Sequence, residues 1–377
     1  MRIAVLVIAL LVPKIIFGAN APTLAKNGMV VSMNELSSQI GIGIMMEGGS
    51  AVDAAVAIAF ALAVTHPSAG NIGGGGFLVY RPNKGEAITY DFREVAPKAS
   101  YPEMWLVDGA YSSAKHHHSY WSVGVPGTVA GLYLAWQDHG SLPWEKLVQP
   151  AIELASKGIE VSHGLSASLK GVLPRMQKYP ASIAKFTKNG VPYEPGDIWK
   201  QPDLASSLKH IASKGPSGFY KGKTAELLVA EMQANEGLIT LEDLAKYEAK
   251  KREPVRGSYR GFEIFSMPPP SSGGTTLIEM LNILEGYSLS EMGFGSADTL
   301  HLMTEAMRRA YEDRAQFLGD PDFNTDMPLK RLLSKPYASS LRSTIHLSQA
   351  TSSSPERFKQ AEESPETTHF SVVDKER

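Results

Sequence analysis

The chain has 377 residues, of which 43% are hydrophobic and 20% charged, and its formal net charge is −2. These values are typical of a folded protein long enough for two or three ordinary domains or one large α/β domain. The near-neutral charge leaves no basic field for a nucleic-acid partner. The chain has no cysteine, which excludes disulfides, thiolate metal ligands and a cysteine nucleophile and suits an oxidising compartment.

The first 21 residues have the pattern of a secretory signal peptide. Arg2 precedes an apolar run from Ile3 to Val12, and the small residues Ala19 and Ala21 follow. The run is far shorter than the ~20 residues that a membrane-spanning helix needs. We therefore expect residues 1–21 to be a signal peptide, the protein to be periplasmic or secreted, and no stable membrane span.

The chain that follows is expected to begin with a strand and two helices. The strand covers 29–33, and apolar residues at helical spacing between 36 and 45 predict a helix that ends at Gly48-Gly49. Ser50 and Asp53 form a capping-box variant for a second helix, Ala51–Val64. This helix is apolar nearly all round, so we expect it to be covered on every side.

A glycine run follows this helix and leads into a predicted hairpin. Gly73–Gly76 precede a strand at Phe77–Tyr80, and a turn connects it to a second strand at Ala87–Phe92. A dinucleotide fingerprint requires strand, glycines and helix in that order, so it is excluded. Arg93 ends the hairpin. It is either a salt-bridged edge residue or a bidentate clamp for a substrate carboxylate.

The middle of the chain is predicted to be mainly helical. Three consecutive histidines, His116–His118, point in different directions on any regular element, so we interpret them as a solvated loop and predict no metal site. A near match to a phosphate-binding loop at 218–224 has the wrong spacing and no preceding strand. Residues 179–203 and 348–364 are expected to be loops. Helices are predicted at 127–138, 142–156 (capped by Ser141), 164–178, 224–235, 240–247, 275–284 and 298–318, and a strand at 259–265.

Near the end of the chain, Glu366-Thr367-Thr368 follows a Ser-rich segment and precedes alternating apolar residues typical of a strand. Thr367 has two interpretations. It is an ordinary Thr at the start of a strand, or it is a nucleophile whose free α-amine serves as the adjacent base once the chain is cut before it.

Several motifs occur in the order of one enzyme family, and on these residues the chain resembles the γ-glutamyltranspeptidases from about residue 25 to its end. The motifs are Gly48–Ala55, Thr65-His66-Pro67, Asn71–Phe77, Asp91–Glu94, Pro126–Gly131, Met267–Gly274, Leu318–Asp322 and Thr367–Val372.

This resemblance implies an N-terminal-nucleophile hydrolase fold, an α/β (α+β) class αββα sandwich, made as an exported proenzyme that cuts itself before a Thr. Thr367 matches the catalytic nucleophile, and Arg93 matches the residue that holds the α-carboxylate of the γ-glutamyl group. The implied partners are glutathione and other γ-glutamyl compounds, acceptor amino acids or peptides, and a small subunit from the same precursor. No cofactor and no metal are implied.

By the same resemblance, residues 22–366 form the large-subunit region and 367–377 only the start of the small subunit. The family's second supporting Thr, its substrate-amine contacts and its oxyanion-hole glycines have no counterpart here. The fold is therefore expected to be incomplete, with exposed apolar faces on the helices at 51–64 and 298–318. The alternative to an active enzyme is a truncated, inactive remnant of the family.

Overall fold

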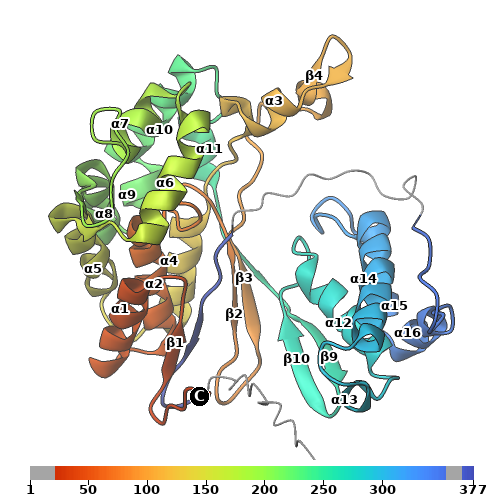
Figure 1. Ribbon diagram of the computed structural model, residues 1–377. Helices are drawn as coiled ribbons and strands as arrows, with labels where there is room; N and C mark the ends of the chain where they lie inside the picture. Colours follow the sequence, from red (N-terminus) through yellow and green to blue (C-terminus); the bar gives the residue numbers. More distant parts are fainter. Residues whose placement is uncertain (1–21, 354–366) are drawn as a thin grey trace, which may run out of the picture.

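The computed structural model describes residues 22–353 and 367–377. Two lobes lie on either side of a central antiparallel hairpin, and the first lobe is mostly helical (Figure 1). Helices and antiparallel strands are mixed, as expected for an α+β protein. The predicted signal peptide, Glu366 and most of the predicted loop at 348–364 lie outside the described residues. Within them, every helix is too short or too polar to cross a bilayer.

The central hairpin joins the two lobes. Strand β2 (Phe77–Tyr80) pairs antiparallel with β3 (Ile88–Asp91), and β3 pairs on its other side with β8 (Lys250–Arg252). Asp91 thus lies opposite both Phe77 and Lys250. The predicted hairpin is confirmed, with its second strand one residue shorter at each end.

The two ends of the described chain meet in a separate sheet. Strand β1 (Met29–Val31) pairs antiparallel with β11 (Ser371–Val373), so that Met29 lies opposite Val373. The predicted strand after Thr367 is therefore present, and its partner is the first strand of the chain.

The first lobe is organised around α2 (Ala51–Thr65), which is buried along nearly its whole length. Its capping box is confirmed: the Ser50 hydroxyl accepts from the Asp53 N–H at 3.1 Å, and the Asp53 carboxylate accepts from the Ser50 N–H at 2.8 Å. Around it pack α1 (Glu35–Met46), α4 (Thr128–His139) and α5 (Trp144–Lys157), and α5 also packs against α8 (Pro202–Lys214).

Further helices and short strands complete this lobe. They are β4 (Leu106–Val107), β5 (Ala110–Tyr111), α3 (Ser113–His117), β6 (Ile159–Glu160), α6 (His163–Met176), α7 (Pro180–Phe186), β7 (Ile198–Trp199), α9 (Ser217–Tyr220), α10 (Gly222–Ala234) and α11 (Leu241–Lys246), with 3₁₀ turns at Pro102–Trp105 and Tyr120–Ser122. The segment with β4, β5 and α3 projects from the body of the molecule (Figure 1).

The second lobe contains a hairpin and a helical layer. Strands β9 (Val255–Tyr259) and β10 (Phe262–Ser266) pair antiparallel, and α12 (Gly273–Leu284) packs on them and on α14 (Ala297–Phe317). The remaining helices are α13 (Leu289–Met292), α15 (Leu329–Leu332) and α16 (Lys335–Arg342). A small core of Ile283, Leu284, Leu302, Ala306 and Ala338 joins α12, α14 and α16.

Several predicted elements were wrong. Residues 179–203 are not a continuous loop but contain α7 and β7, because Phe186 packs against the buried Trp199 ring at 5.6 Å. The predicted strand at 259–265 is a hairpin that turns at Arg260, whose φ is +49°. Ser141 does not cap α5, which begins after Pro143; the Ser141 hydroxyl donates to Asp53 instead.

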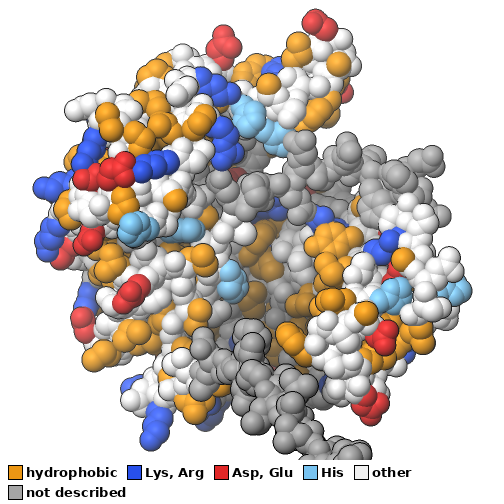
Figure 2. All heavy atoms as spheres, viewed as in Figure 1, with side chains coloured by type: hydrophobic (Ala, Val, Ile, Leu, Met, Phe, Trp, Pro, Cys, Tyr) orange, Lys and Arg blue, Asp and Glu red, His pale blue; other side chains and the backbone are white. Residues whose placement is uncertain are grey.

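The expected exposed apolar faces are found on one of the two helices. The expectation was wrong for α2, because α1, α4 and α5 cover it. On α14, by contrast, Leu300, Met303, Met307 and Tyr311 are 54%, 42%, 45% and 42% exposed. Figure 2 shows hydrophobic side chains gathered over this lobe.

Candidate active site

Thr367 begins the final described segment and is exposed. Four residues later the chain enters β11, where Val372 packs against the main core. Beyond the strand, the Asp374 carboxylate accepts a hydrogen bond of 3.0 Å from the Ala51 N–H, at the N-terminus of α2. A carboxylate is stabilised there by the free N–H groups and by the helix dipole. These contacts hold the strand that follows Thr367.

The Thr368 hydroxyl oxygen is buried, and it has no hydrogen-bond partner among the described residues. The two adjacent threonines thus differ in environment. Thr367 is open to solvent, as attack on a substrate requires, whereas the hydroxyl of Thr368 is enclosed.

Arg93 follows the carboxyl end of β3, and hydrogen bonds hold both its backbone N–H and its backbone carbonyl. Its N–H donates to Asp91 Oδ1 at 3.1 Å, and its carbonyl accepts from the Tyr247 hydroxyl at 2.8 Å. The side chain is exposed and forms no ion pair with any residue in 22–353 or 367–377. Of the two sequence interpretations, the salt-bridged edge residue is therefore not supported within this part of the chain. The guanidinium is available for a carboxylate.

The glycine run packs directly against this strand end. Gly76 and Phe92 exchange backbone hydrogen bonds of 3.3 and 3.1 Å, and a Cβ on Gly75 would lie 2.5 Å from the Phe92 carbonyl oxygen. The Asn71 side chain shapes the run, because its oxygen accepts from the Gly74 N–H at 2.9 Å and from the Thr128 hydroxyl at 2.6 Å. The glycines thus permit a close backbone approach beside Arg93.

Thr367 and Arg93 belong to the same end of the molecule. Asp374 marks the N-terminal end of α2, and β11 lies against this helix, so the residues before β11 run toward its C-terminal end. The 15 residues of α2 cover about 22 Å. The glycine run follows that C-terminal end. In Figure 1, the start of the β11 segment and the carboxyl end of β3 both reach the upper end of the central strands.

A series of ion pairs connects to the backbone of Arg93 through Asp91. Asp91 Oδ2 accepts from Arg252 Nε at 2.8 Å, and the two Arg252 Nη atoms bind the two oxygens of Asp322 at 3.2 and 2.9 Å. Bonds from Arg252 and then from Lys250 lower the pKa of Asp322 to about 2. Sequence reasoning missed Asp91, Tyr247 and Arg252 as neighbours of the site, although Asp91 and Asp322 stood in the motifs that indicated the family.

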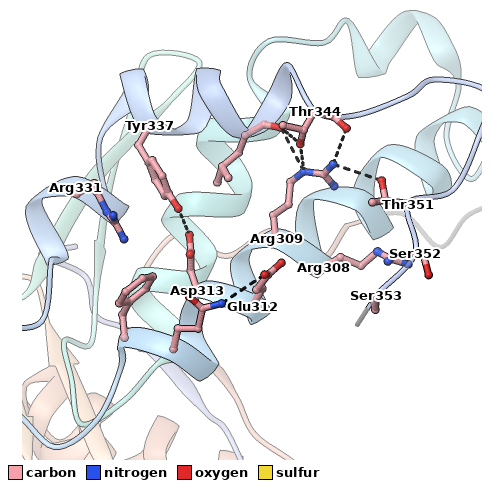
Figure 3. A pocket seen from close by; sticks show the side chains of 13 residues that line it. Arg308, Arg309, Glu312, Asp313, Arg331, Tyr337, Thr344, Thr351, Ser352 and Ser353 are labelled. Carbon is pink, nitrogen blue, oxygen red and sulfur yellow. Dashed lines mark hydrogen bonds between the residues drawn. The ribbon is translucent and has the colours of Figure 1, made fainter. Parts of the chain in front are cut away.

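A cavity of about 810 Å³ lies elsewhere, between α14 and α16 (Figure 3). Neither Thr367 nor Arg93 lines it. Arg309 points into it, but its guanidinium already donates to Glu305, to the backbone of Leu341 and Thr344, and to the Thr344 hydroxyl. We therefore do not place the candidate active site in this cavity.

The histidine triplet is not the predicted loop, because His116 and His117 end α3. The Tyr111 hydroxyl lies 2.7 Å from His116 Nδ1 and 3.1 Å from His117 Nε2, and Trp105 packs on the His116 ring at 4.3 Å. These contacts hold the projecting segment together. Among the described residues, no cluster of three or more histidine, aspartate and glutamate side chains has the arrangement of a metal site.

Comparisons with known proteins point to one enzyme family. The family model described as Gamma-glutamyltranspeptidase matches residues 37–377. The glutathione hydrolase proenzyme of Escherichia coli is 48% identical over 94% of this chain and 62% of its own length, and that of Pseudomonas sp. (strain A14) is 44% identical over 95% and 63%. The chain thus spans about three fifths of the length of these curated relatives.

The crystal structure of Helicobacter pylori gamma-glutamyltranspeptidase is 44% identical and superposes with a TM-score of 0.85, covering 90% of this chain and 97% of the other. This likeness confirms the predicted N-terminal-nucleophile hydrolase fold class. A family match over nearly the whole chain, with identity of this order, leaves one conclusion: the chain belongs to the γ-glutamyltranspeptidase family.

Proposed function

We propose that this chain carries the nucleophile and one substrate clamp of a γ-glutamyltransferase and glutathione hydrolase, with Thr367 as nucleophile and Arg93 as clamp. The observation that carries the proposal is the arrangement of these two residues. An exposed Thr lies four residues before a strand that is anchored to the core, and an exposed Arg with a fixed backbone lies at the same end of the molecule.

Processing comes first in this proposal. The Thr367 hydroxyl attacks the carbonyl carbon of residue 366, the peptide C–N bond breaks, and the acyl group moves to oxygen as an ester. Water then hydrolyses the ester, which frees the α-amine of Thr367. The residue now contains both a nucleophile and an adjacent base.

In turnover, the α-amine takes the proton of the Thr367 hydroxyl while its oxygen attacks the γ-carbonyl carbon of glutathione. The amide bond breaks, the departing amine receives the proton, and a γ-glutamyl ester remains on Thr367. Water gives hydrolysis, and an acceptor amino acid or peptide gives transfer. The Arg93 guanidinium pairs with the α-carboxylate of the γ-glutamyl group through its planar fork. These steps use hydroxyl, amine and guanidinium groups and require no cofactor.

We further propose that residues 1–21 direct export to the periplasm or the medium, and that 22–366 and 367–377 belong to the large and small subunits. Support comes from the signal-like N-terminus and from the greater length of the relatives named as proenzymes. In this proposal the rest of the small subunit is the partner that completes the site. The alternative is that the chain is an inactive remnant of the family, and the following experiment distinguishes it from an active enzyme.

The test is to incubate the purified chain, identify any new N-terminus by mass spectrometry, and follow release of p-nitroaniline from a γ-glutamyl anilide. Whatever cleavage before Thr367 and turnover the wild type shows, Thr367→Ser should show as well. Thr367→Ala should stop both, and Thr368→Val is the matched control that should not. An intact, inactive wild-type chain would refute the activity of this chain by itself, and cleavage that persists in Thr367→Ala would refute the assigned nucleophile.

A further inference from the structure

Three charged side chains from separate parts of the sequence form a continuous connection to the backbone of Arg93. Asp322 follows α14 in the second lobe, Arg252 is the last residue of β8, and Asp91 is the last residue of β3. Arg252 donates to both carboxylates, through Nε to Asp91 and through its two Nη atoms to Asp322. Asp91 completes the connection with its second oxygen, which accepts from the Arg93 N–H.

Burial distinguishes this connection from ordinary surface ion pairs. The side chains of Asp91 and Arg252 are only 8% and 16% exposed, and that of Asp322 is 35% exposed. Charge-assisted hydrogen bonds that are shielded from water are short and directional, and the bidentate contact with Asp322 permits one orientation of the guanidinium plane. Exposed pairs elsewhere, such as Arg256–Glu86, lack this restriction.

The backbone carbonyl of Arg93 is held by a separate contact. The Tyr247 hydroxyl donates to the Arg93 carbonyl, and the Tyr247 ring stacks on Tyr220 with an interplanar angle of 3° and a centroid distance of 5.7 Å. Both hydrogen bonds reach the backbone of Arg93 and leave its guanidinium unoccupied. The contacts therefore determine where the side chain starts without using the group that would bind substrate.

From this geometry we infer that Asp322 and Arg252 are positioning residues for Arg93, acting through Asp91. The inference rests on the proposed role of Arg93 as the clamp for the α-carboxylate of the donor. It also gives a role to the segment Leu318–Asp322, which lies in the second lobe and takes no part in the proposed chemistry. Because this segment belongs to the second lobe, the position of Arg93 depends on how the second lobe packs against the central hairpin.

The experiment compares Asp322→Asn, which keeps the size but removes the charge, with Glu86→Gln. Glu86 is the matched control, because its ion pair with Arg256 also links the hairpin to the second lobe but does not contact Asp91. With the γ-glutamyl anilide as donor, Asp322→Asn should raise KM about tenfold with kcat and cleavage before Thr367 nearly unchanged, since small displacements of a substrate-positioning group weaken productive binding. Glu86→Gln should change neither constant.

A mutant cycle separates positioning from general stabilisation. In an Arg93→Ala background the substitution of Asp322 should raise KM no further, because its effect passes through Arg93. Equal effects of Asp322→Asn in both backgrounds, or an unchanged KM with Arg93 present, would overturn the inference.

A second readout does not depend on turnover. Hydrogen exchange of the Arg93 amide should become about tenfold faster in Asp322→Asn and in Arg252→Gln, and stay as in the wild type in Glu86→Gln. If the wild-type chain does not turn over the donor, the proposed function of the isolated chain fails while this arm still decides the inference. Exchange at Arg93 that is the same in all variants would refute it.

Discussion

Replacing Glu279 with glutamine is expected to remove a large pH dependence from the stability of the second lobe. Glu279 lies on α12, is 1% exposed, and faces Asp313 on α14, which also accepts a 2.8 Å hydrogen bond from the Tyr337 hydroxyl. One Glu279 oxygen is buried without a hydrogen-bond partner among the described residues. Burial, followed by the neighbouring Asp313 carboxyl, raises the pKa of Glu279 from 4.5 to about 9.

The sign follows from proton linkage. Between these two pKa values the folded protein keeps the proton on Glu279 and the unfolded chain has lost it, so stability falls as the pH rises. The free energy of unfolding decreases by about 1.4 kcal/mol for each pH unit above 4.5. At pH 7 the protein has therefore lost about 3 kcal/mol of stability. Glutamine is neutral in both states and its amide can donate to Asp313 as the protonated acid does. Any change in the stability of the variant from burying the amide is the same at every pH. The prediction therefore concerns only how the difference in free energy of unfolding between variant and wild type changes with pH.

The assay is urea denaturation of the wild type and Glu279→Gln at several values between about pH 5 and about pH 8. The variant should gain stability relative to the wild type by about 1 kcal/mol or more for each unit of increasing pH. The control is Glu291→Gln, an exposed glutamate in the same lobe, whose difference from the wild type should stay constant. A constant difference for Glu279→Gln would show that this carboxyl is ionised in the folded protein, and the reasoning would be wrong.

Two further predictions concern the anchored C-terminal strand and the ion pairs behind Arg93. Asp374→Ala should lower the free energy of unfolding by about 1 kcal/mol, because the Ala51 N–H loses its acceptor, whereas Asp374→Asn keeps an oxygen there and should cost less; urea denaturation of both measures this. Since the pKa of Asp322 is lowered to about 2, the stability from its pair with Arg252 is complete above the unfolded pKa of about 4 and is lost as the pH falls toward about 2. Acid denaturation of Asp322→Asn should therefore converge with that of the wild type near about pH 2, and a constant gap down to that pH would contradict the shift.

Elements with local signals were the most predictable from the sequence. The Ser50–Asp53 box, the apolar helix that follows and the turn between the two hairpin strands each depend on residues within one turn of each other. The short elements in 179–203 could not be predicted in this way. They exist because α7 and β7 pack on the core through Phe186 and Trp199, and no periodicity of their own indicates this.

In the candidate site, too, local sequence predicted some features and long-range packing determined others. The residue types of Arg93 and Thr367, with the motifs around them, were sufficient to predict the family. The contacts that hold Arg93 were not predictable, because Arg252 is 161 residues from Asp91 and 70 from Asp322. Pairing over such separations depends on how β8 joins the hairpin and on where the second lobe lies, and neither follows from a local pattern.

The anchoring of Thr367 depends on α2, which is buried along nearly its whole length, rather than on the residues next to the Thr. The N-terminus of α2 has N–H groups without partners inside the helix. Ser50 satisfies the N–H of Asp53, and Asp374 satisfies that of Ala51. Pairing of β11 with β1 fixes the register between these contacts and Thr367. A helix that cannot move without disrupting the core therefore holds the strand that leads back to Thr367, and this is why we expect Asp374 to matter for a residue seven positions before it.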